Sequence, residues 1–145
     1  HPQVKKKIIY PPSQSIPLQT LGQLAHYHFT SPFLVGINNL YGSWFAYRAL
    51  VLSKSNFTNP EKEKTHSPCV TCRSKICISK CPAQACDETA FNMKACLNYR
   101  LKEHSLCEHT CQARVSCPES TEHKYSTEQI QYHYQRSLNM IKSVK

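Results

Sequence analysis

All nine cysteines of this 145-residue chain lie between Cys69 and Cys117. Large aliphatic residues are scarce in this half of the chain, so hydrophobic burial alone is not expected to hold it together. An odd number of cysteines leaves one without a partner in any framework of disulfides. The cysteine spacing therefore decides between disulfides, structural zinc and iron–sulfur clusters.

Two of the cysteines are followed directly by proline, in Cys81-Pro82 and Cys117-Pro118. The first run begins at Cys69 and has the form C-x2-C-x4-C-x3-C-P, whereas the second run, from Cys96, is looser. Bacterial ferredoxins with two 4Fe–4S clusters use the form C-x2-C-x2-C-x3-C-P, in which the fourth cysteine binds the other cluster. The proline also helps to turn the chain away from the site. The pattern favours two clusters.

The crossover rule divides eight cysteines into two sets of four. We expect the first 4Fe–4S cluster to bind Cys69, Cys72, Cys77 and Cys117. We expect the second cluster to bind Cys81, Cys96, Cys107 and Cys111. Cys86 remains outside both sets and is expected to be a buried spectator.

The two rival explanations fit the spacing less well. Structural zinc favours paired C-x2-C knuckles, and only Cys69 and Cys72 form one, so a structural zinc-binding protein stays an alternative. A disulfide framework conflicts with the odd count and with the absence of a secretory leader that we infer from the chain's start. A Rieske centre needs two histidine ligands, and eight well-placed cysteines leave no vacancy for them.

The formal charge of +9 has two explanations. Basic residues are scattered, with Lys5-Lys6-Lys7 as the one run, and we expect much of the excess to offset negative cluster thiolates rather than to bind nucleic acid. A cluster that senses iron or oxygen and acts on nucleic acid stays a weaker alternative. The apolar run from Trp44 to Leu52 contains Arg48 and is too short to cross a bilayer. We expect a cytoplasmic protein without membrane insertion.

The organisation predicted is an α+β fold in two parts. Residues 1–65 form an N-terminal extension, with an extended arm over 1–16, a short helix within 18–29, and a buried strand over 40–53. A polar linker spans 54–68. Residues 66–145 form a small two-cluster ferredoxin-like domain with a C-terminal helix.

Within the second part, two helix starts are predicted from local patterns. Asn92 is expected to cap a short helix that carries Cys96. Ser126-Thr127-Glu128-Gln129 has the form of a capping box at the start of the last helix. The apolar stripe of that helix is expected to pack on the cluster module and consists of Ile130, Tyr134, Leu138 and Ile141.

Residues 40–118 resemble a known family. The resemblance rests on Tyr41-Gly42-Ser43-Trp44-Phe45, Cys69-x2-Cys72, Cys81-Pro82, Cys96-Leu97-Asn98-Tyr99-x3-Glu103-His104 and Cys117-Pro118. These motifs are similar to the C-terminal iron–sulfur module of epoxyqueuosine reductase. They are also similar to bacterial dicluster ferredoxins with a Tyr-Gly-x-Trp-x-Ala-Tyr-Arg segment. The x4 spacing before Cys77 departs from the x2 of the reductase.

The resemblance implies electron delivery by two 4Fe–4S clusters. In the reductase the clusters pass electrons to a cobalamin, but its catalytic acid lies in a preceding domain that nothing before residue 40 resembles. We therefore expect an electron-transfer protein with a redox partner protein and no catalytic residue of its own. The alternative is the electron-input portion of a corrinoid-dependent reductase, which would make the chain part of an oxidoreductase.

Overall fold

The computed structural model of the protein describes residues 5–11, 16–55 and 65–144. Four short strands and one helix make up the described first part of the chain, whereas helices and loops make up the cysteine-containing part. The mixed composition confirms the predicted α+β class at this coarse level. In chain order the elements are β1 (Lys6–Tyr10), α1 (Leu18–Leu24), β2 (Phe29–Thr30), β3 (Gly36–Ile37), β4 (Leu50–Ser53), α2 (Pro68–Thr71), α3 (Ile76–Ser79), α4 (Met93–Arg100), α5 (Gln112–Val115), the 3₁₀ turn η1 (Thr121–His123) and α6 (Thr127–Ser143).

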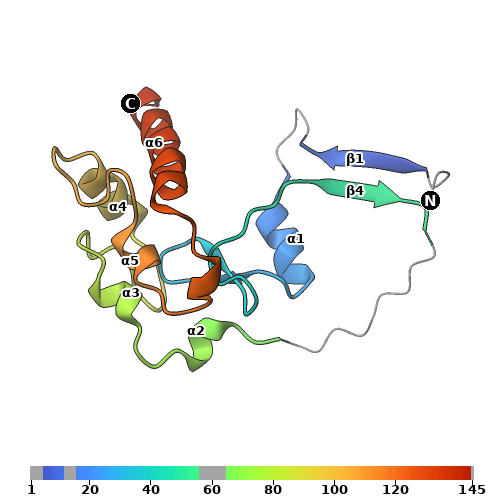
Figure 1. Cartoon of the computed structure of the whole chain (residues 1–145), viewed down its shortest axis with the longest axis horizontal. Helices are drawn as coiled ribbons and strands as arrows, with labels where there is room; N and C mark the ends of the chain where they lie inside the picture. The colour runs from blue at the N-terminus through green and yellow to red at the C-terminus, as the bar shows by residue number, and fades with distance from the viewer. Residues whose placement is uncertain (1–4, 12–15, 56–64, 145) are drawn as a thin grey trace.

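The strands form two separate antiparallel ribbons. β1 pairs with β4, with Lys6 opposite Ser53 and Ile8 opposite Val51. β2 pairs with β3, with Phe29 opposite Ile37. Figure 1 shows the β1–β4 ribbon on one side of the molecule and helices α2 to α6 on the other, with α1 between them.

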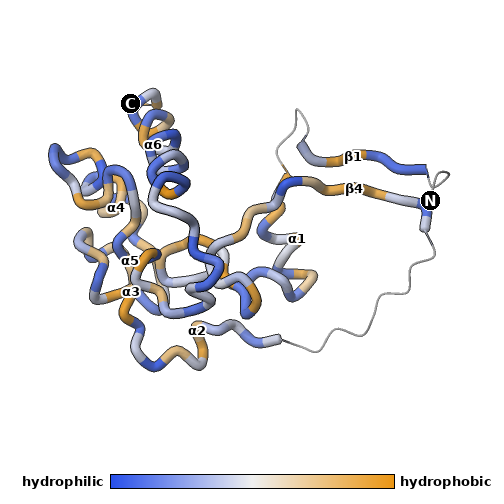
Figure 2. The backbone as a smooth tube through the Cα atoms, in the orientation of Figure 1, coloured by the Kyte–Doolittle hydropathy of each residue, from blue (hydrophilic) through white to orange (hydrophobic). Residues whose placement is uncertain are grey.

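The predicted buried strand over 40–53 is wrong in both extent and burial. Only Leu50–Ser53 forms a strand, and Val51 and Leu52 are 47% and 63% exposed. Figure 2 shows this apolar strand in the ribbon that lies away from the cysteine segment. The aromatic residues before it do not need a ladder, because distant side chains pack on them. Trp44, for example, is buried beneath the guanidinium of Arg114, 4.2 Å from the ring centre.

Both predicted helix starts are confirmed. The side-chain oxygen of Asn92 accepts a hydrogen bond of 2.9 Å from the backbone N–H of Ala95, and α4 begins at the next residue, Met93. At α6 the Ser126 hydroxyl accepts from the backbone N–H of Gln129, whose side chain accepts in return from Ser126 N–H. These reciprocal bonds satisfy two backbone donors that the helix leaves without a partner.

Helix α6 turns its predicted apolar stripe inward. Ile130 and Leu138 are 7% and 1% exposed, and Tyr134 and Ile141 are half-buried. Tyr134 and Ile141 also line a cavity that is shared with cysteines. The prediction that this stripe packs on the cysteine module is confirmed.

The predicted short helix within 18–29 is also confirmed, as α1, although its Leu24 is largely exposed. Most of the predicted linker and part of the predicted N-terminal arm lie outside the described residues, and the described part of that arm contains β1. The boundary between residues 65 and 66 stays a prediction. None of the helices in the described ranges has both the length and the apolar character needed to cross a membrane.

The core cluster of the molecule joins two residues of the first part of the chain to the cysteine segment and contains few aliphatic side chains. The loop after β2 contributes Phe33, and β3 contributes the fully buried Ile37. The other members of this core cluster are Cys77, Cys86, Ala113 and Cys117. Thiols therefore occupy positions that leucine or isoleucine would fill in an ordinary small domain.

Candidate metal centre

The first expected set of cysteines comes from three short segments. Cys69 lies on α2, which Ser67 caps by accepting from the backbone N–H of Cys69, and Cys72 ends that helix. Cys77 lies on α3, and Cys117 follows α5. Helices α3 and α5 are in contact, and this contact carries Cys117 to the others across forty residues of sequence.

Electrostatic interactions identify the nearest thiols in this set. Burial raises the pKa of Cys77, and the thiols of Cys117, Cys69 and Cys72 raise it further. Burial likewise raises the pKa of Cys117, with Cys69 and Cys72 again among the groups that add to the shift. The structure thus brings all four predicted residues of the first set within electrostatic range of one another.

Lys75 stabilises the loop that the longer x4 spacing creates before Cys77. This residue adopts a left-handed conformation with φ of 42°, and its ammonium group donates a 2.7 Å hydrogen bond to the carbonyl oxygen of Cys69. The same ammonium group lies 3.5 Å from the carboxylate of Glu88. The extra residues therefore form a defined loop that returns to the start of the cysteine run.

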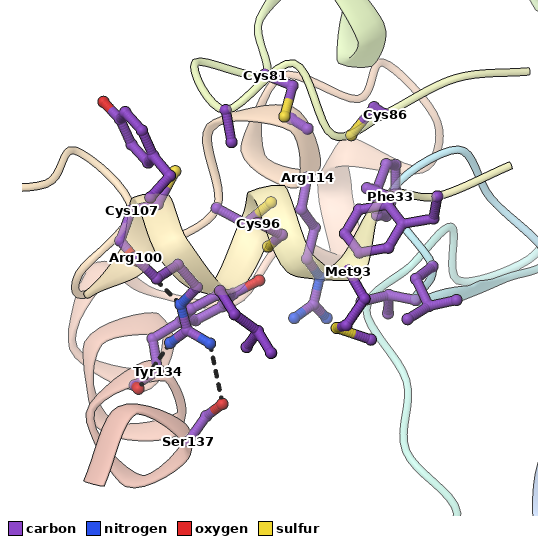
Figure 3. A pocket seen from close by; sticks show the side chains of 18 of the residues that line it. Phe33, Cys81, Cys86, Met93, Cys96, Arg100, Cys107, Arg114, Tyr134 and Ser137 are labelled. Carbon is purple, nitrogen blue, oxygen red and sulfur yellow. Dashed lines mark hydrogen bonds between the residues drawn. The ribbon is translucent and has the colours of Figure 1, made fainter. Parts of the chain in front are cut away.

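The second expected set lines one cavity. Cys81 follows α3, Cys96 lies on α4, and Cys107 and Cys111 belong to the loop before α5. All four residues, together with Cys86, line a cavity of about 570 Å³ between these segments and α6. Figure 3 shows Cys81, Cys86, Cys96 and Cys107 around this cavity.

The thiols of this second set also act on one another. Burial raises the pKa of Cys96 to about 11, with contributions from the thiols of Cys111, Cys107 and Cys81, while the positive charge of Arg100 opposes the shift. Burial raises the pKa of Cys107 as well, and the thiols of Cys111 and Cys81 add to it. At neutral pH these raised pKa values leave the thiols of Cys96 and Cys107 protonated unless a metal or a cation compensates the charge of the thiolate.

Cys81 differs from its neighbours because its sulfur accepts hydrogen bonds. Burial alone would raise its pKa, but bonds from the backbone N–H groups of Ala85, Cys86 and Ala83 and from the Cys86 thiol lower it overall. The bond from Ala85 measures 3.4 Å. The short loop after the Cys-Pro dipeptide thus favours a thiolate at position 81.

Cys86 lies between the two sets. It is 6% exposed, and the thiols that interact with it are Cys81 and Cys111 of the second set and Cys77 of the first. Its pKa is raised, because it is buried and its S–H group donates to Cys81. The residue is buried, as predicted, and it contacts a predicted ligand.

Arg100 adds a buried positive charge to the site. It is 8% exposed, and no carboxylate among the described residues lies within ion-pair distance of it. Its guanidinium donates to the carbonyl oxygens of Cys107 and Tyr134 and to the Ser137 hydroxyl, each at 3.1–3.2 Å. A buried cation without an anion is costly, so this environment favours negative charge on the nearby sulfurs.

The histidines in or near this segment lie beside glutamates. His104, His109 and His123 each face the glutamate that precedes them in sequence, at 3.4–3.9 Å. Among the described residues, no three side chains of His, Cys, Asp or Glu lie close enough to hold a single metal ion.

No protein-family model, curated protein or solved structure matches this chain.

Proposed function

We propose that this chain is an electron-transfer protein that carries two 4Fe–4S clusters in a ferredoxin-like module related to the bacterial dicluster ferredoxins. The observation that carries the proposal is the sorting of eight thiols into two groups. Cys117 joins the group of Cys77, whereas Cys81, which is closer in sequence to Cys77, faces Cys96 in the other. This exchange of the fourth cysteine is the arrangement that two-cluster ferredoxins use.

The chemistry of the donors supports the same proposal. Each group offers four thiols, and thiolate sulfur is the ligand that iron–sulfur clusters use. In the second group the cavity of about 570 Å³ leaves room among the thiols, and Arg100 places a buried positive charge beside them. Four thiolates around a cluster would give this guanidinium the negative charge that the protein itself does not supply nearby.

A bound cluster of this type supplies one-electron transfer at a potential set by burial, charge and hydrogen bonds. The residues of the chain would hold the sulfurs, exclude water and place positive charge near them. Electrons would enter from and leave to other redox proteins.

Anaerobic reconstitution with iron and sulfide tests the proposal. We expect about eight iron and eight sulfide per chain, with the broad visible absorption and the reduced-state EPR signals of 4Fe–4S clusters. Cys86→Ala is the matched control, because it removes a buried thiol from the same cavity without removing a proposed ligand. A colourless protein that takes up zinc stoichiometrically and no iron would overturn the proposal and favour the structural zinc alternative.

A further inference from the structure

The run Lys5-Lys6-Lys7 lies at the start of strand β1, and Lys54 directly follows strand β4. Figure 1 shows the ribbon of these two strands on one side of the molecule and helices α2 to α6 on the other, with α1 between them. A helix with its side chains is about 10 Å across, and salt screens exposed charges over a similar distance. Negative charge on the cysteines therefore does not explain the four lysines of the ribbon.

The register of the ribbon gathers three of these lysines on one face. Lys7 lies opposite Leu52, and the backbone N–H of Lys54 donates a 3.1 Å hydrogen bond to the carbonyl oxygen of Lys5, which extends the pairing by one residue. In an antiparallel pair, residues opposite one another and residues two apart point to the same face. Lys5, Lys7 and Lys54 therefore form one basic face, whereas Lys6 points to the other face.

The basic face has no anion of its own. Its three lysines are exposed, and no carboxylate among the described residues lies within ion-pair distance of them. The first acidic residue of the sequence is Glu61, so residues 1–60 contain five Lys or Arg residues and no Asp or Glu. Lys5 and Lys54 lie directly opposite each other, and like charges in that arrangement destabilise a strand pair. An external polyanion would offset this repulsion.

We propose that the basic face of the β1–β4 ribbon binds the phosphate backbone of double-stranded DNA. A ribbon seated in the major groove lies between two rows of phosphates, which the long stems of lysine can reach as point charges. Contacts of this kind position a protein on DNA without reading its sequence. The inference goes beyond the proposed electron transfer and does not depend on it.

Two features favour DNA over other polyanions. The major groove of B-form DNA admits a two-stranded β-ribbon, whereas that of an RNA duplex is too deep and narrow for side chains to read. Lysine is depleted in protein–protein interfaces, so a face built on three lysines suits a phosphate backbone better than an acidic protein.

The test is a fluorescence-anisotropy titration of a labelled DNA duplex of mixed sequence with the full chain, at salt concentrations between about 50 and 200 mM. We expect log K to fall linearly with log salt. Each phosphate contact contributes about 0.9 to the slope, so removing three should make the line less steep by about 2.7 and weaken binding more than about tenfold at 50 mM salt. The variant is Lys5→Gln/Lys7→Gln/Lys54→Gln.

The matched control removes the same charge elsewhere. Lys94→Gln/Lys102→Gln/Lys142→Gln changes three exposed lysines on or beside α4 and α6, and it should leave the slope almost unchanged. A third variant replaces the three lysines of the basic face by arginine. It keeps the charge and should keep the slope, which separates a loss of charge from a loss of fold.

Equal losses in the glutamine variant of the basic face and in the control would show that net charge alone drives binding, and would overturn the inference. It would also be overturned by tighter binding to an RNA duplex of the same sequence, by the absence of DNA binding, or by binding only to vesicles of phosphatidylcholine and phosphatidylserine. The proposed electron transfer would stand in each case, because the ribbon contains no cysteine.

Discussion

The buried guanidinium of Arg100 donates a 3.2 Å hydrogen bond to the backbone carbonyl oxygen of Cys107, a predicted ligand. No carboxylate among the described residues lies within ion-pair distance of this guanidinium. A buried positive charge therefore fixes the loop that carries Cys107. The same group reaches α6 through Tyr134 and Ser137. Arg100 therefore ties α4, the Cys107 loop and the last helix into one unit.

Replacing this arginine should weaken both the fold and the second site. Arg100→Met keeps most of the side-chain stem but removes three hydrogen bonds, and we expect the free energy of unfolding to fall by about 3 kcal/mol. Urea unfolding of the reconstituted protein under anaerobic conditions measures the change. Arg136→Met, on the exposed side of α6, should cost less than about 0.5 kcal/mol. Equal effects of the two substitutions would contradict the role given to Arg100.

The assignment of ligands predicts which cysteine variants resemble one another. Cys117→Ser should alter the same EPR signal as Cys77→Ser, although Cys111 is much closer to Cys117 in sequence. Cys81→Ser should alter the signal that Cys96→Ser alters. Iron analysis and EPR of these four reconstituted variants, and of Cys111→Ser as a fifth, check the pairing. The grouping would be wrong if Cys117→Ser and Cys111→Ser affected one and the same cluster.

The two directions of pKa shift in the second set predict different reactivity towards iodoacetamide. Cys81 has a lowered pKa, so a larger fraction of it is thiolate near neutral pH, and at about pH 7.5 it should be alkylated well before Cys96. The pKa of Cys96 is raised to about 11, so its alkylation should increase steeply only as the pH approaches that value. Peptide mass spectrometry of the cluster-free chain measures both rates.

Cluster assembly should abolish this difference in reactivity. Metal binding requires the thiolate and releases the proton, so assembly at neutral pH should acidify a weakly buffered solution and protect both cysteines from alkylation. Rapid alkylation of Cys96 at neutral pH in the cluster-free chain would contradict the burial that raises its pKa.

The capping box of α6 should contribute measurably to stability. Ser126→Ala removes the acceptor of the Gln129 N–H group and should lower the free energy of unfolding by about 1 kcal/mol. Ser143→Ala, at the other end of the same helix, removes a bond to a carbonyl oxygen in the last turn and is the control. Because the last turn of a helix frays readily, the control should have a smaller effect in the same urea titration. An equal loss in both variants would argue against the capping box.

Local patterns predicted the helix starts because each capping side chain and the backbone N–H group that it bonds are only three residues apart. Asn92 bonds to Ala95 and Ser126 bonds to Gln129, and no distant residue is needed for either cap. The strand predicted over 40–53 was wrong for the opposite reason. Arg114 packs its guanidinium on the ring of Trp44 and donates a hydrogen bond to Ser43. Because Arg114 lies about seventy positions later in the chain, no local pattern contains these contacts.

The sequence by itself determined the chemistry available to this protein, because the nine closely spaced cysteines and the two Cys-Pro dipeptides are properties of the chain before it folds. It also determined the caps of α4 and α6, because hydrogen bonds between near neighbours decide them. Only the tertiary structure decided which side chains surround the thiols. Burial and the charge of Arg100 act on Cys96 and Cys107, and this buried environment forms only when α4 and α6 pack together.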